Sequence, residues 1–449
     1  MQAFNHKKKE IFLMTNCNKF PIKFSSIKNK KVLVNFNGGE VTSDAGLLLL
    51  KEINKKLNLT KNIAHLFSDK RQKNKTKHSI QDILKQRLFG LALGYEDLND
   101  HDTLKNDSAF QVAVGKETAL ASSPTLCRFE NSFNRKLAVA IHKEILQVFV
   151  KSFKTVPKEL VLDFDATDNP VHGKQEKKAY HSYYGHDCFL PLHVFCGDQL
   201  LISYLRPSNQ DGAKHAWAIS SLLVKYFRKI WPEVKIIFRG DCGFCRHKML
   251  QWFDKNQVDY VVGIGGNSRI KTMLEPTLQE AKERYSETKE KQKIFKKFVY
   301  SAHSWTRKRI VIGKAEYNAK GSNVRFIVTS LNDLAKNLYK KQYCSRGEME
   351  NRIKEQFLLF SDRTSCHRWW PNQLRILLSG LAYILLERMR SLFLKGSKYA
   401  RSQVNTIRLR ILKIGAVIIK NTRKIRFYLS SSFPDQSLFI KLANHFNTS

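Results

Sequence analysis

Acidic side chains gather in one short stretch of an otherwise basic chain. Residues 160–173 read LVLDFDATDNPVHG and contain Asp163, Asp165 and Asp168. Asp163 and Asp165 lie two positions apart at the end of a β-type run, so both side chains leave the same face of the expected strand. A second β-type run, KIIFRGD, ends at Asp241. Because ligands bind where the central strands of an α/β sheet end, we expect these carboxylates to converge.

A third carboxylate, Glu350, comes from a helix-type segment later in the chain. Arg346 and Lys354 lie one turn to either side of it on the same helix face. Two aspartates from strand ends and a glutamate from a helix form the hard, oxygen-rich site that Mg²⁺ or Mn²⁺ prefers. Two such ions can activate a water or a 3′-hydroxyl and stabilise the leaving oxygen of a phosphodiester. The three carboxylates therefore indicate metal-assisted cleavage of a nucleic acid backbone.

Each of these carboxylates also has a purely structural interpretation. An Asp that follows a strand is more often a turn or helix-cap residue, and Asp168 before Asn-Pro fits a turn. Glu350 can simply pair with Arg346 and Lys354. Only the three acids together, in this chain order and in so basic a protein, favour catalysis over these alternatives.

The charge balance points to a polyanionic partner. The chain has 449 residues, with 78 Lys and Arg against 39 Asp and Glu, and its formal net charge is +39. A polyanion relieves self-repulsion of this size, and nucleic acid is the commonest polyanion in cells. The alternative is a basic ribosome-associated or surface-binding protein without catalysis.

The sequence gives no sign of a membrane or secretory destination. The apolar run after Met1 in NHKKKEIFLMTNCNKF is too short for a signal sequence, and no run approaches the ~18 apolar residues of a membrane span. The eight cysteines lack framework spacing, which suits reduced thiols. Cys242 and Cys245 have CxxC spacing, but a structural zinc site needs further ligands and no second such pair follows. We expect a cytoplasmic protein with no membrane partner.

Hydrophobic periodicity divides the chain into regions. Residues 40–150 show the spacing of amphipathic helices, as in SDAGLLLLKEINKKL. From residue 159 three β-type runs follow one another, and two more alternate with helices. This order predicts a mixed sheet with helices on its faces. Residues 266–323 are lysine-rich and polar and do not continue the rhythm, so we interpret them as an insertion.

Two further basic segments suggest contacts with DNA. In TIRLRILKIGAVIIKNTRKIRFYLSS, alternation in two runs separated by KNT predicts a basic hairpin with Arg408 and Arg410 on one face. Such cations suit phosphate contacts, and a merely solvated strand face is the alternative. In YSAHSWTRKRIV, Trp305 lies close to Arg307 and other cations. We expect Trp305 either to stack on an unpaired base near a cleaved end or to anchor a small β-subdomain.

A series of blocks in the chain resembles a known family. In order, they are VTSDAGLLLL, GLALGYEDLNDHD, SPTLCRFENS, LDFDATDNPVHG, YYGHDCFLPLHVFCG, RGDCGFC and RGEMENRIKEQ. Together they resemble the DDE transposases of bacterial insertion sequences, in the cut-and-paste group with an RNase H-like catalytic core. The resemblance runs over most of the chain. It implies that Asp165 and Asp241 are the family's two aspartates, while Asp163 either shares metal binding or supports the strand.

The resemblance also assigns residues of the later helix. The group's signature of Tyr, two residues, Arg, three residues and Glu falls on Tyr343, Arg346 and Glu350. The family lysine seven positions beyond the Glu corresponds to Phe357 here, so we expect Lys354 to take its role. Tyr343, Arg346 and Lys354 are expected to contact phosphate near the cleaved end, Arg346 through a bidentate fork.

The expected fold class is α/β, and the resemblance implies its layout. An N-terminal all-α domain, residues 1–150, recognises the ends of the element. An RNase H-like mixed sheet with flanking helices occupies residues 151–265 and 324–365. A β-rich insertion, residues 266–323, interrupts this core, and residues 366–449 form a C-terminal helical region with a basic hairpin.

We therefore predict a transposase that binds the terminal inverted repeats of its own insertion sequence. Asp165, Asp241 and Glu350 would hold two Mg²⁺ or Mn²⁺ ions for strand cleavage and for transfer of the freed 3′-hydroxyl to target DNA. The expected partners are double-stranded DNA and a second copy of the chain, in a bacterial cytoplasm and associated with the nucleoid. The alternatives are a catalytically silent DNA-binding relative that regulates transposition and a structured RNA-binding protein.

Overall fold

Residues 21–447 are described by the computed structural model of this chain, and residues 1–20 and 448–449 lie outside that description. The segment after Met1, for which we expect no secretory signal, and Cys17 fall in the undescribed N-terminal part. Within residues 21–447, no helix combines the length and the apolar character needed to cross a membrane. The cysteines of the same range are free thiols.

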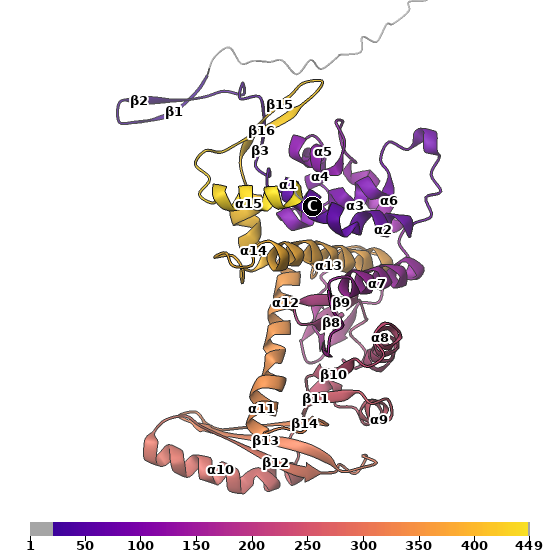
Figure 1. The fold of residues 1–449 in the computed structure, drawn as a ribbon, viewed down its shortest axis with the longest axis vertical. Helices are drawn as coiled ribbons and strands as arrows, with labels where there is room; N and C mark the ends of the chain where they lie inside the picture. The colour runs from indigo at the N-terminus through magenta and orange to yellow at the C-terminus, as the bar shows by residue number, and fades with distance from the viewer. Residues whose placement is uncertain (1–20, 448–449) are drawn as a thin grey trace, which may run out of the picture.

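An eight-stranded mixed sheet carries the strand order β12-β13-β14-β11-β10-β4-β8-β9 (Figure 1). Strands β4, β10 and β11 run parallel, and the remaining neighbours in this sheet pair antiparallel. The expected mixed α/β fold is therefore confirmed. The strands are β4 (Glu159–Ala166), β8 (Leu192–Cys196), β9 (Gln199–Tyr204), β10 (Lys235–Gly240), β11 (Asp259–Ile264), β12 (Gln292–Tyr300), β13 (Arg309–Asn318) and β14 (Gly321–Thr329).

Two helices return the chain between the parallel strands and cover the sheet. Their buried apolar residues, among them Phe227 and Phe253, join Phe164 and Phe238 of the central strands in one core. This burial is what the helical spacing of the apolar residues dictates, because only one side of each helix faces the sheet. The helices are α8 (Ala216–Ile230) and α9 (His247–Lys255).

The N-terminal helices pack around one long helix from the C-terminal part, α13 (Trp369–Leu392) (Figure 1). Leu377, Leu381 and Leu385 of this 24-residue helix are fully buried in the same core cluster as the N-terminal helices. These helices are α1 (Leu47–Leu57), α2 (Leu59–His65), α3 (Ile80–Leu93), α4 (Asp100–Leu104), α5 (Ser108–Val114), α6 (Ser123–Asn131) and α7 (Arg135–Val150). The helical region is thus built from two distant parts of the sequence.

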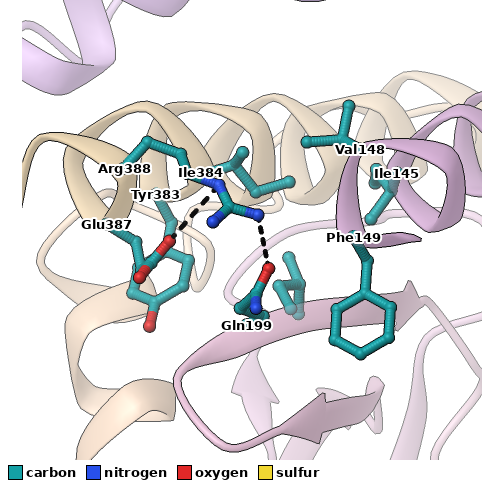
Figure 2. A pocket seen from close by; sticks show the side chains of 9 residues that line it. Ile145, Val148, Phe149, Gln199, Tyr383, Ile384, Glu387 and Arg388 are labelled. Atoms are coloured by element: carbon teal, nitrogen blue, oxygen red, sulfur yellow. Dashed lines mark hydrogen bonds and ion pairs between the residues drawn. The ribbon is translucent and has the colours of Figure 1, made fainter. Parts of the chain in front are cut away.

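The α13 helix also contacts strand β9 of the large sheet. Figure 2 shows a small cavity at this junction, where side chains of α7 and α13 meet Gln199 at the start of β9. Arg388 donates a hydrogen bond to the Gln199 side-chain oxygen at 2.5 Å and lies 3.8 Å from the Glu387 carboxylate. The polar side chains that line the cavity bind one another. The cavity therefore marks the place where the helical region packs against the sheet.

Three smaller sheets complete the described fold. One contains β5 (Asn169–Pro170), β6 (Ala179–His181) and β7 (His186–Phe189), directly after β4 in the chain. A two-stranded hairpin is formed by β1 (Ile22–Ile27) and β2 (Lys30–Val34). The third joins β3 (Glu40–Thr42), β15 (Ala416–Lys420) and β16 (Ile425–Leu429), next to the C-terminal helix α15 (Gln436–Asn447).

Residues 266–323 differ from the β-rich insertion that we expected. They begin with α10 (Ser268–Thr288), a helix capped by the Asn267 side chain, which accepts from the Ile270 amide at 3.1 Å. Ile270 and Leu274 bury this helix against β13 and β12. The strands of the segment extend the large sheet beyond β11, and residue 323 lies inside β14. Few residues of α10 are apolar and buried, so the hydrophobic periodicity that predicts a helix is weak in this lysine-rich segment.

The C-terminal hairpin begins later than predicted. Residues 416–429 form the hairpin, whereas the strand expected at Arg408 and Arg410 is wrong: α14 (Val404–Ile407) and a π-helical turn (Arg408–Leu412) occupy that position. Ile411 and Leu412 of the turn are buried in the helical core. Tertiary burial against neighbouring helices decides the backbone here, and the local alternation of apolar and basic residues does not.

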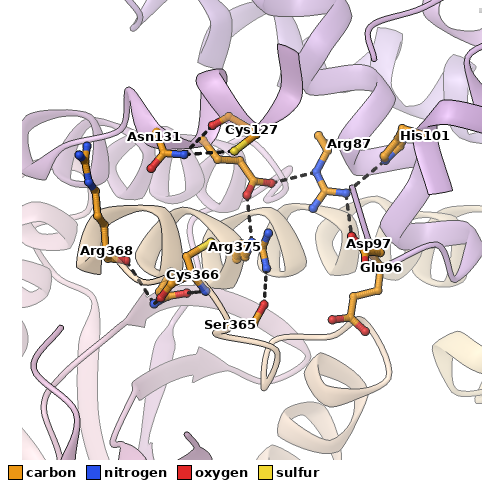
Figure 3. Close-up of polar contacts among 12 residues, drawn as sticks. Arg87, Glu96, Asp97, His101, Cys127, Asn131, Ser365, Cys366, Arg368 and Arg375 are labelled. Carbon is orange, nitrogen blue, oxygen red and sulfur yellow. Dashed lines mark hydrogen bonds and ion pairs between the residues drawn. The ribbon is translucent and has the colours of Figure 1, made fainter. Parts of the chain in front are cut away.

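A buried charge network connects α3, α6 and α13 (Figure 3). Arg87 donates to Glu130 at 3.1 Å, and Arg375 donates to the second Glu130 oxygen at 2.9 Å. Glu130 is 1% exposed, and Arg87 also donates to the Glu96 carbonyl at 3.2 Å. One carboxylate therefore pairs with two guanidinium groups from helices far apart in the sequence.

Glu130→Ala is expected to lower the free energy of unfolding by about 3 to 5 kcal/mol, because it removes the carboxylate with which two largely buried guanidinium groups pair. Urea denaturation measures the change. Glu280→Ala is the control, since Glu280 forms an exposed pair with Arg284 one turn along α10 and such pairs contribute about 0.3 to 0.5 kcal/mol. Equal losses in the two variants would show that the network adds nothing beyond surface pairing.

Candidate active site

Two neighbouring parallel strands bring Asp165 and Asp241 to one edge of the large sheet. β4 and β10 pair in a register that sets Phe164 beside Gly240, so the next residues along the two strands are Asp165 and Asp241. Asp241 lies just past β10, where its carboxylate accepts from the Gly243 amide at 2.8 Å. Two carboxylates thus occupy the end of the sheet where α/β folds bind ligands.

Asp163 fills a different position on β4. It is 2% exposed, and Arg239 of β10 donates to both of its carboxylate oxygens, to Oδ2 at 2.7 Å. Arg239 also donates to the Gln342 carbonyl at 2.6 Å. Because both Asp163 oxygens are taken by one guanidinium, this arrangement favours the supporting role for Asp163 over metal binding.

The chain returns to the site through an irregular helical segment. After β14 come α11 (Ala335–Asn337), a π-helical turn (Leu338–Tyr343), a 3₁₀ turn (Cys344–Arg346) and α12 (Gly347–Phe357). The hydrogen bond from Arg239 fixes this segment at Gln342, just before the turn that carries Arg346. Met349 and Ile353 pack α12 against the helical core.

Arg346 connects the glutamate to the aspartates. Its guanidinium lies 3.1 Å from Asp165 Oδ2 through Nη1 and 2.8 Å from Glu350 Oε1 through Nη2. The four-residue spacing of Arg346 and Glu350 places both side chains on one face of the helix. The structure therefore brings Asp165, Asp241, Arg346 and Glu350 into one cluster.

Electrostatics in the cluster centre on Asp165. Its side chain is 15% exposed, and burial raises its pKa to about 7, with further contributions from the negative charges of Asp241 and Glu350. The Arg346 guanidinium opposes this rise in the pKa. One guanidinium does not balance three carboxylates, so the site favours additional positive charge.

Tyr343 lies beside the cluster because β11 has a glycine there. A Cβ atom added at Gly263 would come within 2.7 Å of the Tyr343 hydroxyl and 2.8 Å of the Cys242 amide nitrogen. Burial raises the pKa of Tyr343, and the nearby Arg346 opposes that rise. Sequence reasoning identified Tyr343 and missed Gly263, for which the only signal was a glycine inside a predicted strand.

The chain also matches a family model over most of its length. The family model described as transposase DDE domain group 1 matches residues 24–449. The chain belongs to this family. The recognition made from the sequence is thus confirmed, and membership implies a polynucleotidyl transferase or nuclease activity of the kind for which DDE transposases generally use divalent metal ions.

Solved structures and curated proteins were compared as well. A cryo-EM structure of the piggyBac transposase synaptic complex with hairpin DNA is similar over 83% of this chain and 80% of that chain, with 13% identity and a TM-score of 0.42. No curated protein matches the chain.

The carboxylates of Asp165, Asp241 and Glu350 fit a divalent cation in their chemistry. They supply only oxygen ligands, and the buried Asp165 carries two like charges nearby that a cation would offset. In residues 21–447, no three His, Cys, Asp or Glu side chains are already placed to hold a metal ion. Arg346 lies between Asp165 and Glu350, so metal binding by the full set requires the guanidinium to move.

The other basic residues predicted for this transposase lie in different surroundings. Lys354 is exposed one turn beyond Glu350 on α12. Arg408 donates to the carbonyls of Ala92 and Leu358, at 2.9 and 2.8 Å, and its guanidinium is therefore held by the helical region. Arg410 is exposed in the same π-helical turn. Arg408 and Arg410 are thus not on a common strand face.

Trp305 and Arg307 make internal contacts. The Trp305 ring lies edge to face with Tyr300 at 5.5 Å, and the Arg309 guanidinium lies 5.6 Å from its centre. Arg307 pairs with Asp254 of α9 at 2.5 Å. These contacts favour the alternative in which Trp305 anchors the strands around it.

The block YYGHDCFLPLHVFCG, part of the family resemblance, begins with an aromatic turn near Asp165. The β6–β7 turn carries Tyr183, which is 84% exposed, and Tyr184, whose ring lies 5.0 Å from it. Burial raises the pKa of Tyr184 to about 12, with contributions from Asp168 and Asp165. His186 pairs with Asp168 at 3.0 Å. The chain after β4 therefore returns aromatic side chains to the site.

Gly263→Ala is expected to destabilise the protein by about 1 to 3 kcal/mol, because the new methyl group overlaps the Tyr343 hydroxyl and the Cys242 amide. Gly265→Ala is the matched control, since nothing lies within 4 Å of a Cβ at that position. Urea denaturation compares the two. Adding Tyr343→Phe to Gly263→Ala should recover part of the loss; no recovery would contradict the close approach of the hydroxyl.

Trp305→Ala is expected to lower the melting temperature, because a half-buried ring that packs on Tyr300 and Arg309 contributes about 2 kcal/mol. Binding to DNA ends with paired bases and binding to ends with unpaired bases should change equally in this variant. Trp217→Ala is the control, because the Trp217 side chain on α8 is 50% exposed, and it should lower the melting temperature less than Trp305→Ala does. An unchanged melting temperature with selective loss of binding to unpaired ends would instead support base stacking.

Proposed function

We propose that this chain binds the terminal inverted repeats of its own insertion sequence, cuts the DNA strands there and joins the freed 3′-hydroxyl to target DNA. The observation that carries the proposal is the cluster of Asp165, Asp241 and Glu350 around Arg346 at one edge of the sheet. Carboxylates from two strand ends and a returning helix have no need to meet in a passive binding protein. Family membership makes the same class of reaction the expected one.

We propose that the part of the sheet with the order β9-β8-β4-β10-β11 is an RNase H-like core. Its support is the topology, in which three antiparallel strands precede two strands parallel to the first. Residues 151–265 and 324–365 would supply this core, and residues 266–323 would be the insertion. Residues 1–150 would recognise the DNA ends, and residues 366–449 would complete the protein with α13 and the C-terminal hairpin.

Asp165, Asp241 and Glu350 would hold two Mg²⁺ or Mn²⁺ ions. When bound, such ions activate a water or a 3′-hydroxyl as the nucleophile and stabilise the leaving oxygen of the phosphodiester. The support is the oxygen-only ligand set and the excess of negative charge around the buried Asp165. Asp163, held on both oxygens by Arg239, keeps β4 and β10 in the register that sets Asp165 beside Asp241.

Arg346 would bind carboxylates in the protein alone and a phosphate in the complex with DNA. In the protein alone it balances Asp165 and Glu350 at 3.1 and 2.8 Å. A planar guanidinium matches a phosphate equally well through a bidentate fork, so a DNA backbone near the cleaved bond can take its place as partner. Tyr343 interacts with this guanidinium, and the exposed Lys354 on the same helix face would offer a second cation to phosphate.

Other contacts with DNA would come from the general surplus of cations, because the net charge of +39 favours any polyanion. Arg410 is exposed and suits a phosphate contact. The internal partners of Trp305, Arg307 and Arg408 support a structural role for these residues. Cutting two ends of one element together would require two copies on the DNA, so we propose a homodimer in that complex.

Glu350→Gln and Asp241→Asn are each expected to lower the rate of Mg²⁺-dependent nicking of terminal-repeat DNA by about 10²-fold or more. Each substitution removes the charge of a proposed ligand and keeps its shape. DNA affinity should change little, because phosphate contacts supply most of it. Nicking of a labelled end and binding by electrophoretic shift measure the two effects. Asn at position 241 can still accept the Gly243 hydrogen bond, so the local turn is preserved.

Glu348→Gln is the matched control, because Glu348 lies two positions earlier on α12 with its side chain 69% exposed. It should cut at the wild-type rate. Wild-type cleavage by Glu350→Gln would overturn the catalytic assignment. Specific binding without any nicking by the wild-type protein would point to the silent regulatory relative instead.

A further inference from the structure

Two cysteines lie in one turn directly after Asp241. Cys242 and Cys245 are free thiols in the loop between β10 and α9, which connects the parallel strands β10 and β11. The chain forms a 3₁₀ turn here (Cys242–Phe244), and the Cys245 amide donates a hydrogen bond to the Cys242 carbonyl at 3.3 Å. A CxxC pair beside a βαβ unit is typical of thiol–disulfide chemistry.

The turn brings the two side chains to a separation that a disulfide can bridge. In a 3₁₀ turn, side chains three residues apart lie above one another, and a rise of ~2 Å per residue sets their Cα atoms about 6 Å apart. Disulfides join residues whose Cα atoms are about 4.4 to 6.8 Å apart. Cys242 and Cys245 stand three residues apart in this turn. Their thiols can therefore join without a rearrangement of the neighbouring elements.

The two thiols differ in their access to solvent. Cys242 is exposed, whereas Cys245 packs against the core that the sheet forms with α8 and α9. Phe244, between the two cysteines, is 2% exposed, and its ring lies 6.1 Å from that of Phe238 on β10. The core thus holds Phe244 and Cys245 in place, so Cys242 is the residue that must move when the thiols join.

Movement of Cys242 acts directly on Asp241. The Asp241 carboxylate accepts a hydrogen bond from the Gly243 amide at 2.8 Å, and Gly243 lies between the two cysteines. A disulfide closes a ring of the chain that contains this amide. Its formation therefore shifts the residue that follows Asp241 and the amide that holds the carboxylate.

We propose that Cys242 and Cys245 form a reversible disulfide, and that this disulfide lowers the activity of the site around Asp241. Disulfides of cytosolic proteins are usually transient and catalytic or redox-sensing. The formation of the disulfide is independent of the enzymatic activity, whereas its effect on cleavage rests on the proposed function.

The oxidant in this reaction is a small-molecule disulfide. The Cys242 thiolate attacks one sulfur of the oxidant, whose S–S bond breaks, and one thiolate leaves. The Cys245 sulfur then loses its proton and attacks Cys242 Sγ, which expels the second thiolate. The two protons of the pair end on the expelled thiols, and two electrons pass from the pair to the oxidant.

Peptide mapping tests the disulfide without DNA or metal ion. The full chain is incubated with oxidised glutathione, denatured, alkylated and cut by trypsin after Arg239 and Arg246. The peptide released, GDCGFCR, contains both cysteines of the pair and no other. We expect this peptide to lose two hydrogens, to take up no alkyl group and to regain both thiols with dithiothreitol.

Substitution of single cysteines provides the controls for the mapping. Cys245→Ser should retain one glutathione on Cys242, because the second thiol is missing. Cys127→Ser is the matched control, since Cys127 is an exposed cysteine on α6, and it should leave the oxidised peptide unchanged. Two free thiols in the peptide after oxidation, or a bond from Cys242 to a cysteine elsewhere in the chain, would overturn the proposal.

Nicking of terminal-repeat DNA with Mg²⁺ measures the effect on the site. The oxidised protein should nick about tenfold more slowly or less, because small displacements of a catalytic group have effects of at least this size. Dithiothreitol should restore the rate, and Cys242→Ser should nick equally with and without oxidised glutathione. Equal rates for the oxidised and reduced wild-type protein would refute the effect on activity. A disulfide that forms in a protein without nicking in either state would support the thiol pair and count against the proposed function.

Discussion

The parallel pairing of β4 and β10 is the constraint on which the site depends. The register that sets Phe164 beside Gly240 leaves Asp165 and Asp241 side by side where the strands end. The buried pair of Asp163 and Arg239 connects the same two strands one residue pair earlier. A slip of one residue would turn the side chains to the opposite face of the sheet and break this ion pair. The register of β4 and β10 therefore determines both the core packing and the geometry of the site.

Arg239 also connects the two strands to the segment that carries Glu350. Its hydrogen bond to the Gln342 carbonyl fixes the segment that leads into Arg346 and Glu350. π and 3₁₀ turns interrupt the regular helix in this segment before α12. Gly263 makes room for Tyr343 at the point of closest approach. Support for Glu350 thus comes from backbone contacts that are remote from its own side chain.

Charge is distributed in opposite ways in the core and at the site. Between the helices, Glu130 pairs with both Arg87 and Arg375, so cations outnumber the acid. At the sheet edge, Arg346 faces three acids, and burial raises the pKa of Asp165 to about 7. The first arrangement is complete within the protein. The second is short of positive charge, which is the property expected of a site that takes up cations or exchanges its guanidinium for another partner.

The sequence alone was sufficient for the family, for the class of fold and for a set of candidate carboxylates. Strand ends and helix faces follow from periods of two and 3.6 residues, which are local properties, so Asp163, Asp165, Asp241 and Glu350 could be identified as candidates. The family resemblance then favoured Asp165 over Asp163. The mixed sheet followed from the order of those periods. The family blocks then gave the recognition that the family comparison confirmed.

Only the tertiary structure decided which of the remaining residues join the site. Arg408 alternates with apolar residues as a strand would, yet burial of Ile411 and Leu412 places it in a helical turn, where carbonyls of α3 and α12 hold it. The role of Asp163 depends on Arg239, and that of Gly263 on Tyr343, both distant partners in the sequence. Such contacts arise from the packing of whole elements, so no local pattern in the chain can specify them.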